Sequence, residues 1–345
     1  MNPNFQDMKN DEFREKFIHM VVRGKNSSTY KFAFARFLIE YCNNEDASQH
    51  IEFSTVALYF LRFYWPQICK TKLKHSPKYI QKDGTEKIVE IVSIIEKEFT
   101  ESWYPKPFTY YEEHEESKIK NCVDEIAGIN GCLKDVVWRF QKINDAENTI
   151  FYEYKVKLDW TDPNRKKTDL SFGINLNPDA MKFIKSNYFL LRSLVIFEWA
   201  RFLEKFNRNV PLIIPKLEGS EIKRNTSYAN KAKLELEKFH KKCFYCAKDL
   251  TVDNTHLEHV IPFDYIADDN IWNYALACQK CNCKKLGSLP PEKFLDNLID
   301  NIVEDRERIP MLNDSLVIIG DDFEDDIRNH YSNAKKFGYV PKPMP

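Results

Sequence analysis

Glycine is scarce in this sequence, at 9 of 345 residues. Because tight turns between strands depend on glycine, the scarcity disfavours an all-β protein and favours helices. No run of 18 apolar residues occurs, so we expect no transmembrane span and no membrane partner. The opening stretch MNPNFQDMKNDEFREKF is polar and lacks the apolar core of a secretory signal, so we expect a cytoplasmic protein.

The sequence also lacks an excess of either charge, and its net charge is -1. This excludes a general attraction to polyanions, so any nucleic-acid surface must be a local basic patch. Residues 70–87 hold six Lys against two acids, residues 216–250 hold nine Lys/Arg against five acids, and residues 295–328 hold eleven acids against three Arg. We predict that Lys72, Lys74 and Lys78 contact nucleic-acid phosphates; the alternative is a solvated basic loop.

The composition, 43% hydrophobic and 30% charged, is that of a globular protein of two or three domains. Residues 1–100 are predicted to be helical, because apolar residues recur at helical spacing in 27–42, 54–65 and 87–99. Ser27, Ser28 and Thr29 are candidate caps for the first helix, and Ser54 for the second.

Residues 101–235 are predicted to contain a linker at 101–117, one β-hairpin at 149–176, and a long helix at 178–206 capped by Asn177. An acidic helical segment is expected at 291–345. The predicted fold class is mainly α, with a helical N-terminal scaffold containing one β-hairpin and a small α+β module at 236–290.

The sequence has nine cysteines, and a reducing compartment favours metal binding over disulfides. Two C-x-x-C pairs, CFYC and CQKC, are separated by 31 residues. Four thiolates form the closed tetrahedral shell of a structural zinc, which leaves no open position for a reacting water. The zinc ligands are predicted to be Cys243, Cys246, Cys278 and Cys281. The others are expected to be structural or buried small residues: Cys42, Cys69, Cys122, Cys132 and Cys283.

Between the two cysteine pairs lies HLEHVIPF, residues 256–263, followed by DDNIWNYALACQKCNCKK. His259 precedes Asn273 by 14 residues, and Asn273 precedes Asn282 by 9. From Cys243 to Lys285 this pattern resembles the HNH nuclease family in its His-Asn-Asn form. The resemblance implies a ββα-metal module held at its base by zinc.

The resemblance implies that His259 is the general base and that Asn273 holds its ring. It also implies that Glu258 and Asn282 bind the catalytic metal, Mg²⁺ or Mn²⁺. The chemistry of these side chains agrees, because imidazole titrates near neutrality and hard oxygen ligands suit Mg²⁺. Many members have Asp where this chain has Glu258, and the longer arm would shift the metal.

Three further residues in this region have open roles. His256 has no role implied by the resemblance, so packing or a surface position competes with a DNA or metal contact. A zinc pair of His256 and His259 is also conceivable, although the thiolates already complete a zinc shell. Lys284 and Lys285 either contact phosphate or face water.

The resulting hypothesis is a metal-dependent HNH endonuclease that cuts double-stranded DNA in restriction or anti-phage defence. A non-catalytic zinc-knuckle nucleic-acid-binding protein is the alternative, as is an RNase or structure-specific nuclease. One site per chain implies nicking, and double-strand cutting would require a homodimer. The helical scaffold would position nucleic acid or a partner protein of a defence system.

Overall fold

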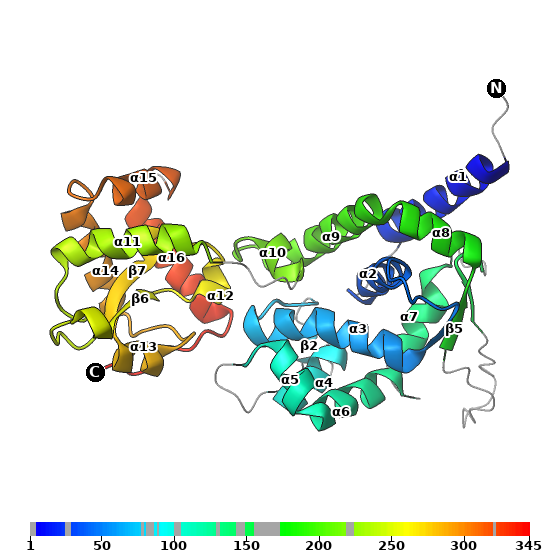
Figure 1. The fold of residues 1–345 in the computed structure, drawn as a ribbon, viewed down its shortest axis with the longest axis horizontal. Coiled ribbons are helices and arrows are strands. Elements are labelled where there is room, and N and C mark those ends of the chain that lie inside the picture. The colour runs from blue at the N-terminus through cyan, green and yellow to red at the C-terminus, as the bar shows by residue number, and fades with distance from the viewer. Residues whose placement is uncertain are drawn as a thin grey trace. The chain divides into compact units, whose positions relative to one another are not determined.

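The computed structural model describes residues 5–24, 29–76, 79–80, 86–87, 90–99, 105–128, 132–142, 149–154, 173–218, 224–319 and 322–345. The chain divides into two compact units. Unit 1 comprises residues 1–69 and 74–206, and unit 2 comprises residues 70–73 and 207–345 (Figure 1). The fold is mainly α with small antiparallel sheets, as the sequence predicted. No helix in the described ranges is both long and apolar enough to span a membrane.

Unit 1 is built around a helix that is apolar on most of its surface. This helix, α2, buries nine of its residues and packs against α3, α7, α8 and α9. Aromatic rings fill the contact, with Phe32 stacked 6.5 Å from Trp199 and Tyr64 tilted 5.7 Å from the same indole. The helices of unit 1 are α1 (Phe5–Ile18), α2 (Tyr30–Cys42), α3 (Phe53–Trp65), α4 (Glu90–Phe99), α5 (Phe108–His114), α6 (Glu116–Ala127), α7 (Leu133–Phe140), α8 (Pro178–Ser186) and α9 (Tyr188–Glu204).

The sheet of unit 1 has three antiparallel strands in the order β1-β5-β4. The pairing of β4 (Tyr152–Glu153) with β5 (Gly173–Leu176) confirms the predicted hairpin, whose turn at 161–167 lies outside the described residues. Sequence patterning missed β1 (His50–Glu52), because three residues are too few to reveal an alternation. A further pair, β2 (Tyr79–Ile80) with β3 (Glu86–Lys87), lies within the lysine-rich stretch 70–87.

Three local predictions were wrong. The long helix at 178–206 is interrupted at Asn187, whose side chain donates to the Phe183 carbonyl and ends α8 before α9 begins. The linker at 101–117 instead contains α5 and the start of α6, because the buried ring of Tyr111 packs against Trp65 and Phe99. Ser54 does not cap α3, since the helix already begins at Phe53.

Unit 2 contains two five-residue antiparallel strands, β6 (Thr255–His259) and β7 (Tyr274–Cys278), paired from Thr255↔Cys278 to His259↔Tyr274. Helix α11 packs on β7, and α13 packs on both strands (Figure 1). β6, β7 and α13 form the ββα arrangement that the resemblance implied. The helices of unit 2 are α10 (Ile213–Glu218), α11 (Thr226–Phe239), α12 (Phe263–Ile266), α13 (Gln279–Lys285), α14 (Lys293–Asp305), α15 (Pro310–Ile319) and α16 (Phe323–Lys336).

Candidate active site and metal centre

The four predicted zinc ligands converge at the base of the β6–β7 pair. The Sγ atoms of Cys243, Cys246, Cys278 and Cys281 all lie within 4.8 Å of one another. The amide of Cys278 donates to the Cys243 sulfur at 3.3 Å. Burial raises the pKa of the Cys243 thiol, but backbone N–H groups directed at its sulfur lower it to about 7. Four sulfurs at this spacing, with backbone donors to a thiolate, fit a structural zinc.

Two knuckle turns hold the sulfurs in place. Ala247 adopts a left-handed conformation (φ 55°) and its amide donates to the Cys243 carbonyl, which closes the first turn. The rings of Phe244 and Tyr245 pack against Phe294 of α14, at 5.8 and 5.1 Å. The second turn opens α13, so the knuckle fixes the start of the helix that carries Asn282.

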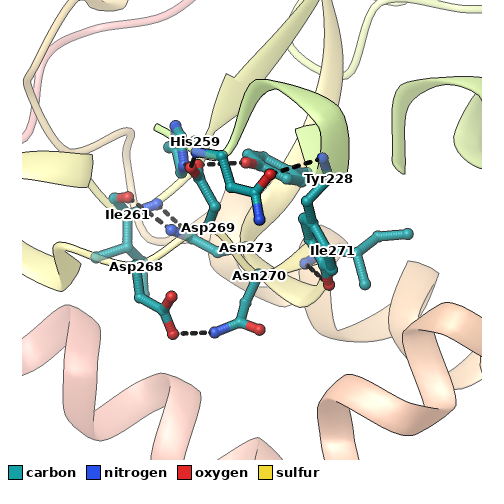
Figure 2. Close-up of polar contacts among 10 residues, drawn as sticks. Tyr228, His259, Ile261, Asp268, Asp269, Asn270, Ile271 and Asn273 are labelled. Atoms are coloured by element: carbon teal, nitrogen blue, oxygen red, sulfur yellow. Dashed lines mark hydrogen bonds and ion pairs between the residues drawn. The ribbon is translucent and has the colours of Figure 1, made fainter. Parts of the chain in front are cut away.

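His259 ends β6, and an aspartate holds its ring. His259 Nε2 lies 3.2 Å from Asp269 Oδ1, and both side chains are buried (Figure 2). The rings of Phe263 and Tyr274 lie 5.0 and 4.6 Å from the imidazole. With Nε2 donating to the carboxylate, the second ring nitrogen, Nδ1, is left as the proton acceptor.

Asp269 is itself firmly placed. Its Oδ1 accepts from the Tyr274 hydroxyl at 2.5 Å, and its Oδ2 accepts from the Asn225 amide at 2.5 Å. Burial raises the pKa of Asp269, but hydrogen bonds from His259, Tyr274 and Asn225 lower it to about 2. Asp269 is therefore ionised at neutral pH. Sequence analysis missed its role, although an acidic pair at 268–269 within the loop between the strands was a visible signal.

The environment keeps His259 neutral. Burial lowers the pKa of His259 below its usual 6.5, and the hydrogen bond to Asp269 opposes that shift only in part. A neutral imidazole at pH 7 with one nitrogen committed to a carboxylate has the protonation state that a general base needs.

Asn273 is buried, and its described hydrogen bonds go to the backbone that follows His259 rather than to the imidazole ring. Its Oδ1 accepts from the Ile261 amide at 2.8 Å, and its Nδ2 donates to the Ile261 carbonyl at 2.9 Å (Figure 2). Its own carbonyl accepts from the Val260 amide at 2.9 Å. Asn273 therefore fixes the chain just after His259, while Asp269 fixes the ring.

Glu258 precedes His259 on β6 and forms a buried ion pair. Lys285 Nζ, on α13, donates to Glu258 Oε1 at 2.6 Å and to the His259 carbonyl at 2.7 Å. Burial raises the pKa of Glu258 and lowers that of Lys285, and their mutual attraction opposes both shifts. The Lys285 side chain is only 1% exposed, so neither of the two predicted positions, against a phosphate or facing water, matches its place in the structure.

Residues 243–291, called the HNH segment below, match the HNH endonuclease family model. The match covers the four cysteines, both strands and α13, and leaves the rest of the chain unmatched. No curated protein matches the chain.

The remaining predicted residues of the HNH segment lie on α13 and β6. Asn282 is half-buried, and it shares a face of α13 with Lys285, three residues later. Lys284 and Cys283 are exposed, so Cys283 is not the structural residue that we expected. His256 is half-buried on β6 opposite Ala277, and its charge contributes to lowering the pKa of Glu258, two residues along the strand.

The HNH segment has donors for a divalent cation besides the zinc ligands. Lys285 uses only Oε1 of Glu258, and the other carboxylate oxygen and the Asn282 amide oxygen are hard donors of the kind that Mg²⁺ or Mn²⁺ accepts. Tyr245 supplies a buried hydroxyl with no hydrogen-bond partner within the described part of the chain. The charge of Glu258 helps to raise the pKa of this tyrosine, after burial, so the two groups are neighbours. Two hard donors, with water completing the shell, fit a magnesium-type ion.

Just outside the HNH segment, Arg224 was also missed. Its guanidinium lies 5.1 Å from the centre of the Phe263 ring, which in turn packs on His259. Arg224 is exposed, and its charge contributes to lowering the pKa of His259. It is thus a cation at the solvent side of the candidate base.

The basic stretches outside the HNH segment only partly offer an exposed surface. Lys72 is exposed and lies 5.8 Å from the Tyr339 ring, while Lys74 is half-buried. Lys78 lies outside the described residues. Lys216, which begins the second basic stretch, is buried and donates to the Pro211 carbonyl at 2.5 Å, so it contributes nothing to a DNA-facing surface.

Proposed function

We propose that the protein is a metal-dependent HNH endonuclease that hydrolyses phosphodiester bonds in DNA. The observation that carries the proposal is the neutral, buried His259 held by an ionised Asp269, next to Glu258 and within a segment that matches a nuclease family. A neutral imidazole held in one tautomer by an ionised carboxylate has the protonation state and the orientation that a general base needs.

In the proposed reaction, His259 Nδ1 accepts a proton from a water molecule whose oxygen attacks the phosphorus. The P–O bond to the leaving oxygen breaks, and that oxygen is protonated by solvent. Asp269 is a positioning residue that holds the imidazole and stabilises it once it is protonated. Asn273 keeps the chain after His259 in place. Glu258 and Asn282 would hold the divalent cation, which supplies charge neutralisation at the phosphate and the leaving oxygen.

Nucleic-acid binding is proposed to rest on local cations. Arg224, whose guanidinium lies over the Phe263 ring beside His259, is the first candidate. Lys284, Lys72 and Lys74 are the other candidates in the described ranges, and Lys78 is a candidate from the sequence alone. Phosphate contacts of this kind supply affinity without sequence preference.

A second candidate is a non-catalytic nucleic-acid-binding protein with a zinc knuckle. One observation favours it: Lys285 already occupies an oxygen of the proposed metal ligand Glu258. A plasmid-nicking assay separates the two. Zinc-loaded protein is incubated with supercoiled DNA and Mg²⁺ or Mn²⁺, and with EDTA as the control. Metal-dependent conversion to open circles supports the enzyme, and binding with no conversion in either metal supports the second candidate.

A role in restriction or anti-phage defence remains part of the proposal, as does a homodimer for cutting both strands. Incubating the protein with modified and unmodified phage DNA, and with RNA of the same sequence, tests the substrate class. Cleavage of RNA alone would reassign the protein as an RNase.

A further inference from the structure

The Glu258–Lys285 pair is unusual because it places a fixed cation where the proposed function needs a divalent one. Lys285 Nζ contacts Glu258 Oε1 at 2.6 Å and the His259 carbonyl at 2.7 Å, with the Leu286 carbonyl at 3.5 Å. Three oxygens around one ammonium group resemble the inner shell of a small cation site. Lysine is rarely buried this completely unless it is paired.

The backbone around Lys285 is built to keep the ammonium group there. Ser288 is buried, and both its amide and its hydroxyl donate to the Lys285 carbonyl. Leu286 has φ 49° and ψ −141°, a positive-φ conformation that is costly for a leucine, and its amide donates to the Asn282 carbonyl. Strain of this kind persists only where the surroundings fix it, and functional sites are where it gathers.

The charges of the candidate site sum to zero without any metal. Glu258 and Lys285 cancel each other whichever of them holds the proton. Asp269 is committed to His259, Tyr274 and the Asn225 amide, and Arg224 provides a compensating positive charge nearby. A divalent cation entering this site would add two positive charges beside a fixed ammonium group, in surroundings that screen charge poorly.

We propose that Lys285 is a resident counter-cation of Glu258, and that it makes tight divalent-cation binding depend on a nucleic-acid phosphate. The phosphodiester supplies the negative charge that Lys285 has cancelled. This inference rests on the proposed function and adds an order to it: the free protein binds the divalent cation weakly, and the nucleic-acid complex binds it tightly. A protein molecule without bound nucleic acid therefore lacks the tightly bound cation that cleavage needs.

The test measures Mn²⁺ binding by electron paramagnetic resonance, using full-length, zinc-loaded protein with the substitution His259→Ala so that DNA is not cut. Mn²⁺ is titrated with and without a DNA duplex, and a titration of the duplex alone is subtracted. We expect the apparent Kd for Mn²⁺ to fall by about tenfold or more when DNA is present. Equal Kd values with and without DNA would overturn the inference, and this comparison needs no change at Lys285.

A second comparison assigns the effect to Lys285. Lys285→Met, in the same background, is expected to raise Mn²⁺ affinity in the absence of DNA by about tenfold and to shrink the gain that DNA provides. Lys280→Met is the matched control, because Lys280 lies exposed on the same helix and loses the same charge. Circular dichroism and zinc content establish that each variant is folded. Lys285→Met with a Kd equal to that of Lys280→Met, or weaker, contradicts the inference.

These outcomes differ from those that test the proposed function. Coupled Mn²⁺ and DNA binding in a protein that never cleaves would leave the inference standing and contradict the nuclease. Cleavage by a protein whose Mn²⁺ affinity is the same with and without DNA would support the nuclease and contradict the inference.

Discussion

Unit 1 and unit 2 each bury a histidine, and the two sites differ in what the ring contacts. In unit 1, His75 Nδ1 lies 3.4 Å from the Thr29 hydroxyl, and its Nε2 has no hydrogen-bond partner among the described residues. In unit 2, His259 donates to the ionised Asp269. Burial lowers the pKa of both, to about 3 for His75. Burial alone therefore makes a neutral imidazole, and only the carboxylate in unit 2 turns it into an oriented proton acceptor.

The interiors of the two units also differ in the kinds of side chain that they bury. Unit 1 buries mainly aromatic rings, such as Phe32, Tyr64 and Trp199, which stabilise a fold and carry out no proton transfer. Unit 2 buries the charged Glu258 and Lys285 beside the cysteine cluster. Unit 1 buries charged side chains as well, but Arg36 and Glu198 are each paired with a more exposed partner on the same helix. In the Glu258–Lys285 pair both partners are buried, which costs stability, and buried ionisable groups of this kind are typical of functional sites.

The largest expected difference between the units comes from removing the zinc that the four cysteines are predicted to bind. Cys243→Ser or Cys281→Ser should unfold the HNH segment, because structural zinc in small domains provides apparent folding free energy of about 10–16 kcal/mol. Unit 1 has no part in the cysteine cluster and should keep its structure. Limited proteolysis with mass spectrometry, alongside zinc analysis, measures this. A variant that lacks zinc but resists proteolysis across 243–291 would refute a structural role.

The two units should also respond to pH in different windows. The pKa of His75 is about 3 when folded against 6.5 when unfolded, so the unfolded chain binds more protons and stability falls as pH drops from 6.5 towards 3. Burial lowers the pKa of Lys216 to about 7 from 10.5, so in unit 2 stability rises between pH 7 and 10.5. Each contribution is on the order of a few kcal/mol.

Urea denaturation of His75→Gln and Lys216→Met, compared with the parent at pH 4, 7 and 10, checks these windows. His75→Gln should flatten the acid slope only, and Lys216→Met the alkaline slope only. Identical pH profiles for parent and variants would show that neither group titrates as its burial implies.

A smaller effect is expected from Asp269→Asn, which leaves His259 in place. The amide no longer holds the ring in one tautomer, so the cleavage rate should fall by roughly 10–10²-fold while DNA affinity stays nearly constant. Asp268→Asn is the matched control, because Asp268 is exposed and contacts Asn270 rather than His259. Equal single-turnover rates for the two variants would mean that Asp269 does not position the base.

The smallest effect concerns the lysine-rich stretch 70–87. Neutralising Lys72, Lys74 and Lys78 together should reduce the slope of log affinity against log salt by about 0.9 for each phosphate contact that is lost. Zinc content and the cleavage rate at saturating DNA should stay constant. Measuring DNA affinity at several salt concentrations tests this prediction. Superimposable plots of log affinity against log salt for the parent and the triple variant would mean that the stretch never contacts DNA.

How far the sequence predicted the site depends on the range of each interaction. The spacing of two C-x-x-C pairs was enough to bring four sulfurs together, because each pair is a local turn. The family resemblance, not this spacing, implied a ββα module, and the structure places Glu258 and His259 on its first strand and Asn282 on its helix. The local sequence pattern therefore predicted the cysteine cluster and the segment that carries the site residues.

The contacts that define the chemistry were not local. Asp269 reaches His259 from a loop ten residues away, Lys285 reaches Glu258 across 27 residues, and Arg224 approaches from before α11. The spacing of residue types along the sequence does not reveal such pairings, because each depends on how α11 and α13 pack against the strands. The same is true of α5, where the buried Tyr111 overrides a segment that reads as a linker.

The central claim is that His259 is the base of a phosphodiesterase site, and single-turnover cleavage of plasmid DNA tests it most directly. The parent, His259→Ala and the control His256→Ala, which lies three residues earlier on the same strand, are compared at saturating protein with Mg²⁺. We expect His259→Ala to lower the rate by roughly 10²–10⁴-fold with zinc content and DNA affinity unchanged, and His256→Ala to stay within a few-fold of the parent. Cleavage by His259→Ala at the parental rate would contradict the account.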